Sequence, residues 1–209
     1  MIKHVFYLFN DIGLNFGLSS FKLDIFVAFC VAFLFVGLVV VIGRTMDVFE
    51  YGIIRFFARI IGPNLTLFIC NRLTFPGVFL HEMAHAIMVW VTGGKVKRIC
   101  LFEFAKDGRL GHVEFETRGV IWRQMCQLAF SSSAPVYFGI FALSGLYTFM
   151  VTHSLSWIWH GVIIYLMISI FVHMSMSKAD LKNYLKGMTL IFPAACTLCI
   201  AYQYFGIRG

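Results

Sequence analysis

Charged side chains are scarce in this 209-residue chain, in which Asp, Glu, Lys and Arg make up 13% of the residues. A soluble domain carries about 25% charged and about 45–50% apolar residues, whereas 60% of this chain is hydrophobic. Proline is also rare, with 4 residues. These shortages exclude a disordered, collagen-like or disulfide-scaffold protein and leave too little polar surface for a soluble one. The composition therefore indicates a membrane protein built as one helical unit over residues 1–209.

The net charge of +7 does not change this interpretation, because basic loops are a normal result of membrane insertion. We therefore expect the lipid bilayer, and no nucleic acid, as a partner. The six cysteines lie in or beside apolar segments, where a thiol packs as a small hydrophobic group. Cys196 and Cys199 form a C-x-x-C pair without a second pair, which favours core packing over metal or redox chemistry.

Stretches with few or no charged residues predict five membrane spans, because an ionised side chain at the bilayer centre costs about 2.5–3.5 kcal/mol. Their approximate bounds are 25–43, 73–94, 126–151, 157–176 and 187–207. The segment 44–72 mixes apolar and basic residues, which is typical of a helix at the membrane interface, and Gly62-Pro63 should end it. No cleavable signal pattern precedes the first span, so we expect that span to remain as an anchor.

A β-hairpin is predicted after the second span. Two β-prone runs flank Lys106-Asp107-Gly108, and Asp-Gly between such runs is a hairpin signal. The predicted fold is thus an all-α polytopic membrane protein of about five transmembrane helices, with a membrane-associated hairpin over residues 95–116.

The distribution of basic residues predicts the orientation. Twelve Lys and Arg lie in 1–23, 94–123 and 177–187, against five elsewhere. The positive-inside rule then places the N-terminus, the hairpin and the loop around Asp180 in the cytoplasm. We expect a multi-pass protein of a bacterial inner membrane.

The second predicted span contains an H-E-x-x-H motif formed by His81, Glu82 and His85. On a helix, residues i and i+4 are neighbours about 5–6 Å apart at Cβ, which suits two ligands of one tetrahedral zinc ion. Glu82 is the next residue round the helix and can act as a general base on a metal-bound water. The alternative is that these side chains only form hydrogen bonds between helices. A metal would offset the cost of burying them, which favours the zinc site.

A catalytic zinc site has three protein ligands and one water, so a third ligand must come from elsewhere in the chain. Asp180 is the preferred candidate because it follows the fourth span on the same side as the hairpin. His173, inside the fourth span, is the runner-up, and Asp24 and Asp47 flank the first span. Alternatively, Asp180 lies in the first turn of a short helix that Ser177 caps.

The motif, the hairpin candidate and Asp180 together resemble the site-2 proteases, a family of intramembrane zinc metalloproteases, of which this chain would be a minimal and divergent member. Ser132-Ser133-Ala134-Pro135 is similar to the small-residue and proline segment of that family's following span. The resemblance covers about residues 73–187.

This resemblance implies one zinc ion held by His81, His85 and Asp180, with Glu82 as the catalytic base. It implies hydrolysis of peptide bonds in membrane-anchored protein substrates near the cytoplasmic face, in regulated proteolysis, and it leaves room for a regulatory membrane partner.

The hairpin strand Val96 to Phe104 is the suspected substrate-binding segment, because an extended peptide can pair with a strand edge. The simpler interpretation of the hairpin is a solvated loop.

Two other functions stay open. One is a non-catalytic zinc-binding scaffold or pseudoprotease, although a structural zinc site needs no base beside its histidines. The other is a transporter of metal or another solute, which predicts polar residues in several spans and an internal repeat. The sequence contains no such repeat.

Overall fold

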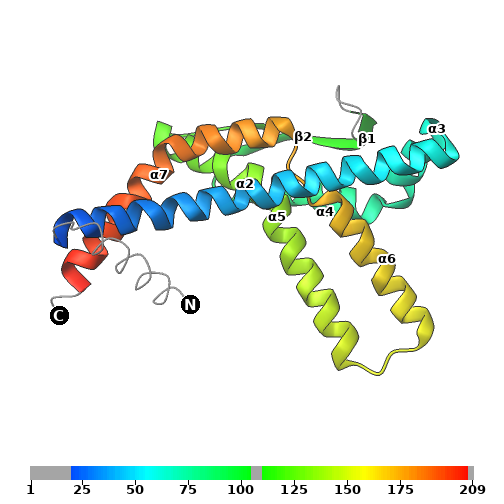
Figure 1. The fold of residues 1–209 in the computed structure, drawn as a ribbon. Coiled ribbons are helices and arrows are strands. Elements are labelled where there is room, and N and C mark those ends of the chain that lie inside the picture. The colour runs from blue at the N-terminus through cyan, green and yellow to red at the C-terminus, as the bar shows by residue number, and fades with distance from the viewer. Residues whose placement is uncertain (1–19, 105–109, 207–209) are drawn as a thin grey trace.

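A computed structural model describes residues 20–104 and 110–206, drawn in colour in Figure 1. The elements in order are α2 (Ser20–Ile61), α3 (Pro63–Phe68), the π-helix η1 (Ile69–Leu73), α4 (Phe75–Val91), β1 (Lys95–Phe104), β2 (Leu110–Glu116), α5 (Ile121–Thr152), α6 (Trp157–His173) and α7 (Lys178–Gly206). Strands β1 and β2 pair antiparallel, with Val96 opposite Phe115 and Cys100 opposite His112. The largely helical character and the predicted hairpin are both confirmed.

Two helices in the described part of the chain are long and apolar enough to cross a membrane, Phe29–Ile61 of α2 and Ile121–Thr152 of α5. Helix α6 and residues Lys178–Leu198 of α7 form a pair bent by 65°, which is a third crossing if the pair acts as one span. Helix α4 is apolar but has 17 residues, a length of about 26 Å against a hydrocarbon core of about 30 Å. The structure thus contains two or three long apolar helices, where the sequence predicts five spans.

Helix α2 is longer than the predicted first span at 25–43 and takes in most of the segment predicted as interfacial. Arg44 does not interrupt the helix, because its guanidinium pairs with the Asp47 carboxylate one turn later at 2.6 Å. The predicted stop at Gly62-Pro63 is confirmed. Gly62 has a φ of +85°, and Pro63 begins α3, where a residue without an N–H is tolerated.

Helix α7 begins at Lys178, before the predicted span at 187–207, so residues 178–186 form its first turns. Ser177 makes this early start possible, since its hydroxyl accepts a hydrogen bond from the Asp180 N–H at 3.0 Å. The helix then packs tightly on α5. A Cβ on Gly187 would lie 2.5 Å from the Met125 carbonyl oxygen, so only glycine allows this approach.

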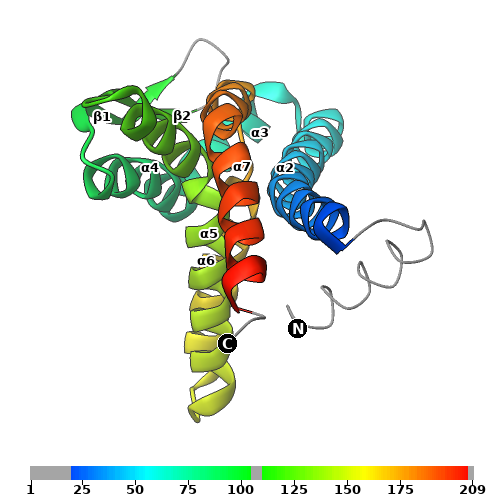
Figure 2. The same ribbon diagram turned by 90° about the vertical axis from the view of Figure 1, so that its left-hand side faces the viewer.

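The helices form two parts. In Figure 1, the second half of α5 and the first part of α6 project side by side away from the other elements, whereas Figure 2 shows α7 between α2 on one side and α4 with the hairpin on the other. A buried core lies where α2, α5 and α7 meet, formed by Val39, Ala129, Val136, Met176, Tyr184 and Met188. This core sets the position of the first turn of α7.

A polar stripe on α6 fixes the start of α4. Tyr165, Ser169 and His173 recur every four residues and so share one helix face. The Tyr165 hydroxyl donates to the Leu73 carbonyl at 2.5 Å, and the Ser169 hydroxyl donates to the Thr74 carbonyl at 2.8 Å. The Leu73 carbonyl is at the end of η1, and the Thr74 carbonyl lies between η1 and α4. The regular helical hydrogen bonds of the backbone are interrupted at this junction.

Gly77 allows this docking, because its N–H donates to the Ser169 hydroxyl oxygen at 2.8 Å. A Cβ on Gly77 would collide with the Ser169 carbonyl oxygen and lie 2.8 Å from Cδ2 of His173. The backbone of α4 therefore lies directly against α6.

Gly77→Ala should destabilise the protein by about 1–3 kcal/mol, because the added methyl group forces α4 and α6 apart. Gly37→Ala is the control, since nothing lies within 4 Å of a Cβ at Gly37 in α2. The control should be neutral or gain up to about 1 kcal/mol from helix propensity. Thermal unfolding in detergent measures both. Equal melting temperatures for the two variants would contradict the docking described for α4.

Candidate metal centre

Helix α4 presents His81 and His85 to the same point. Their ring centroids lie 4.8 Å apart, and the two Nε2 atoms are separated by 3.1 Å. For a tetrahedral ion bound at about 2.0–2.1 Å, two ligand atoms stand roughly 3.3 Å apart. The imidazoles therefore have the separation of two ligands of one ion.

Asp180 reaches this point from the first turn of α7. Its Oδ1 atom lies 3.7 Å from Nε2 of His85. One ligand atom from each of His81, His85 and Asp180 lies within 4.8 Å of the others. His85 is buried and the other two are half-buried. This group, which we call the His-His-Asp group, could hold a metal ion.

Backbone carbonyls orient both imidazoles. Nδ1 of His81 lies 2.6 Å from the His173 carbonyl oxygen, and Nδ1 of His85 lies 2.8 Å from the Ser131 carbonyl oxygen. A carbonyl only accepts hydrogen bonds, so each Nδ1 carries a hydrogen and, in a neutral ring, Nε2 presents its lone pair. Two lone pairs facing each other at 3.1 Å repel, and either a proton on one ring or a shared metal ion removes that repulsion.

Asp180 is held through one oxygen and presents the other. Oδ2 accepts hydrogen bonds from the Ser177 N–H at 3.1 Å and the Ser177 hydroxyl at 2.5 Å. Oδ1 faces His85. The helix cap and the ligand role, which the sequence offers as alternatives, are therefore compatible, since each uses a different oxygen.

Glu82 is 6% exposed, and the hairpin lies against it. A Cβ on Gly111 of β2 would lie 3.0 Å from Cγ and 3.1 Å from Oε1 of Glu82. Gly111 has a φ of +88°, a conformation that favours glycine. Strand β2 therefore packs on Glu82 through Gly111, whereas only β1 is predicted from the sequence as a functional strand.

Gln127 of α5 fastens both ends of the hairpin. Its Oε1 accepts a hydrogen bond from the Arg118 N–H at 2.8 Å, beyond the end of β2. Its Nε2 donates to the Thr92 carbonyl at 3.2 Å, before β1, and to the Arg118 carbonyl at 3.0 Å. A fully buried amide that makes three such bonds fixes the base of the hairpin relative to α5.

The other predicted ligands have different roles. The His173 imidazole lies 2.6 Å from the Thr74 hydroxyl, outside the His-His-Asp group, and His173 contributes its carbonyl oxygen instead. Asp47 pairs with Arg44. The side chain of Asp24 and the turn Lys106-Asp107-Gly108 lie outside the described residues.

The sequence interpretation missed three residues that position the site, Gln127, Tyr165 and Ser169. A signal for two of them was present, since Tyr165, Ser169 and His173 are polar residues at four-residue spacing in an apolar helix. No pattern marks Gln127. The Ser131 carbonyl is a backbone group and has no sequence signal.

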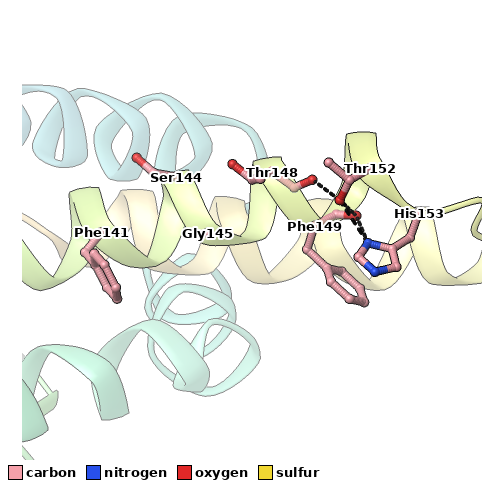
Figure 3. A pocket seen from close by; sticks show the side chains of 7 residues that line it. All are labelled: Phe141, Ser144, Gly145, Thr148, Phe149, Thr152 and His153. Carbon is pink, nitrogen blue, oxygen red and sulfur yellow. Dashed lines mark hydrogen bonds between the residues drawn. The ribbon is translucent and has the colours of Figure 1, made fainter.

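A shallow groove on the projecting half of α5 is separate from this site. Figure 3 shows its lining, which comes from one helix and its end: Phe141, Ser144, Gly145, Thr148, Phe149, Thr152 and His153. Nδ1 of His153 lies 2.9 Å from the Thr152 hydroxyl, and this imidazole is the ionisable group of the lining. Ser131, which contacts the metal centre, precedes Phe141 by ten residues, or about 15 Å of helix.

Comparison with known proteins found no family model, curated protein or solved structure that matches this chain. The candidate site therefore rests on its own residues and geometry.

Added zinc should raise the melting temperature of the purified protein, because an ion that binds the folded state alone stabilises it. The gain is about 2.7 kcal/mol at a free concentration of 100 times Kd. His85→Ala and Asp180→Ala should lose this gain, and a chelator should reverse it in the parent. Asp47→Ala is the control and should respond as the parent does. An equal shift in all four proteins would contradict the assigned ligands.

Proposed function

We propose that this protein is a zinc-dependent intramembrane endopeptidase that hydrolyses membrane-anchored protein substrates. One observation carries the proposal: the buried Glu82 lies in the sequence between two histidines whose side chains converge with a single carboxylate. Among the described residues the group offers three ligand side chains. Catalytic zinc sites use three protein ligands and keep one position open, whereas structural sites are closed by four.

The donor set supports zinc as the ion. Two imidazole nitrogens and one carboxylate oxygen suit zinc, and hard ions such as magnesium or calcium prefer oxygen ligands alone. When bound in such a site, zinc supplies Lewis acidity, which polarises a carbonyl and makes water acidic enough to attack near neutral pH. His81, His85 and Asp180 would hold it.

Glu82 would act as the general base. It follows His81 directly in α4, is buried, and is not one of the three residues of the His-His-Asp group. A carboxylate at that place can take a proton from the attacking water and pass it to the leaving amine. The close packing of Gly111 on Glu82 limits the positions of that carboxylate.

The hairpin would hold the substrate. A helical segment hides its carbonyls in its own hydrogen bonds, so it must unwind before cleavage, and an extended peptide can pair with a strand. Strand β1 contributes the segment Val96 to Phe104, and β2 contacts Glu82 through Gly111. A peptide added to this sheet would pass near the base.

The proposed setting is a bacterial inner membrane, with five crossings and the N-terminus in the cytoplasm. The distribution of basic residues assigns segments 94–123 and 177–187 to the cytoplasmic side. The first segment contains the hairpin and the second contains Asp180, and both contribute to the same proposed site. This supports cleavage near the cytoplasmic face.

Glu82→Gln should abolish cleavage while zinc content stays unchanged, because the amide keeps the shape of the side chain but cannot accept the proton. The test co-reconstitutes the protein in vesicles with single-span reporter proteins tagged at both ends and measures tagged fragments by gel. Loss of activity in Asp180→Ala should come with loss of zinc. Zinc binding by the parent without any cleavage would favour the scaffold or pseudoprotease.

Leu101→Pro should reduce cleavage of the same reporters several-fold with zinc content intact, because proline removes one backbone donor from β1. Leu101→Ala keeps the backbone N–H and is the matched control. If both variants cleave as the parent does, the strand has no part in substrate binding.

A further inference from the structure

The segment from His173 to Asp180 serves both sides of the His-His-Asp group. Its first residue provides the carbonyl that orients His81, and its last residue provides the carboxylate near His85. Between α6 and α7 the chain passes through Met174, Ser175 and Met176, which are 4%, 1% and 0% exposed. We call residues 174–177 the linker. A shift of this linker would move two parts of the metal centre at once.

Helix α2 holds the linker at two points. The Met176 N–H donates to the Gly43 carbonyl at 3.4 Å, and a Cβ on Gly43 would lie 2.6 Å from Sδ of Met176. The Ser175 hydroxyl donates to Oε2 of Glu50 at 2.6 Å. Gly43 and Glu50 are seven residues apart, or two helical turns, so both points lie on one face of α2.

Glu50 is an unusual residue for this place. It is 9% exposed and lies within Phe29–Ile61, the stretch of α2 that is apolar enough to span a membrane. A buried carboxyl in such a helix is unfavourable and points to a specific role. Its bond to Ser175 connects α2, which has no residue in the His-His-Asp group, with the segment that carries Asp180.

We propose that Glu50 is a positioning residue of the metal centre. Through Ser175 it fixes the linker, and the linker fixes the His173 carbonyl and Asp180 relative to α4. The proposal rests on the metal centre proposed above. In this proposal α2 positions the metal ligands, in addition to anchoring the protein in the membrane.

Cobalt(II) is the probe for the test, because its visible absorption reports the geometry of its ligands and its titration gives an affinity. The purified full chain in detergent is compared with Glu50→Ala, Glu50→Gln and Ser175→Ala. Asp47→Ala is the matched control, since it removes another carboxylate of α2, one that pairs with Arg44.

Glu50→Ala and Ser175→Ala should each weaken cobalt binding by about 10–100-fold and change the absorption bands. The freed linker would no longer hold the His173 carbonyl, the outer partner of His81, and loss of such a partner usually has an effect of this size. The double variant should be no weaker than either single one, because both remove the same bond. Glu50→Gln keeps an oxygen acceptor for Ser175 and should restore most of the affinity and the parental spectrum. Asp47→Ala should match the parent.

Two failures are distinguishable. If the parent binds no cobalt, the metal centre itself is wrong and the role of Glu50 falls with it. If the parent binds cobalt and Asp180→Ala does not, but Glu50→Ala and Ser175→Ala keep the parental affinity and spectrum, only the positioning role is overturned. Ser175→Ala removes a single hydroxyl, so it decides the question if Glu50→Ala does not fold.

Discussion

The site depends on two hydrogen bonds, from Nδ1 of His81 and Nδ1 of His85 to backbone carbonyls. They turn both Nε2 atoms toward one point, where their lone pairs repel unless a proton or a metal ion lies between them. Each carbonyl belongs to a different helix, His173 to α6 and Ser131 to α5. Any packing that displaced α5 or α6 from α4 would therefore turn an imidazole away.

The packing around α4 meets this requirement through close backbone contacts and buried polar groups. Gly77 lets α4 lie directly on α6, and the stripe of Tyr165, Ser169 and His173 bonds the interrupted backbone at the start of α4. Gln127 fastens the hairpin to α5, so that Gly111 covers Glu82. In a chain with few charged residues, hydrogen bonds between helices and close backbone contacts hold the helices together.

Much of the site could be predicted from the sequence because it depends on local spacing. The separation of His81 and His85 by four residues fixes their common face, and Asp-Gly between β-prone runs indicates the hairpin. The bounds of the helices could not be predicted equally well. An uncharged run shows where the chain is hydrophobic, but it does not show where a helix begins or ends. Helix α2 continues past Arg44 because Arg44 pairs with Asp47, and α7 starts early because Ser177 caps it. Neither effect is visible in the hydropathy of the sequence. The contacts of Gln127 and Glu50 join distant segments, and a single sequence carries no pattern for such pairs.

The most direct test of the account is zinc content by elemental analysis, with X-ray absorption at the zinc edge, on protein purified in detergent without chelator. The account predicts close to one zinc per chain with nitrogen and oxygen ligands at about 2.0–2.2 Å. The zinc should remain in Glu82→Gln and be lost in His85→Ala and Asp180→Ala. Sulfur ligands, or zinc that survives Asp180→Ala, would contradict the assignment of the site to His81, His85 and Asp180.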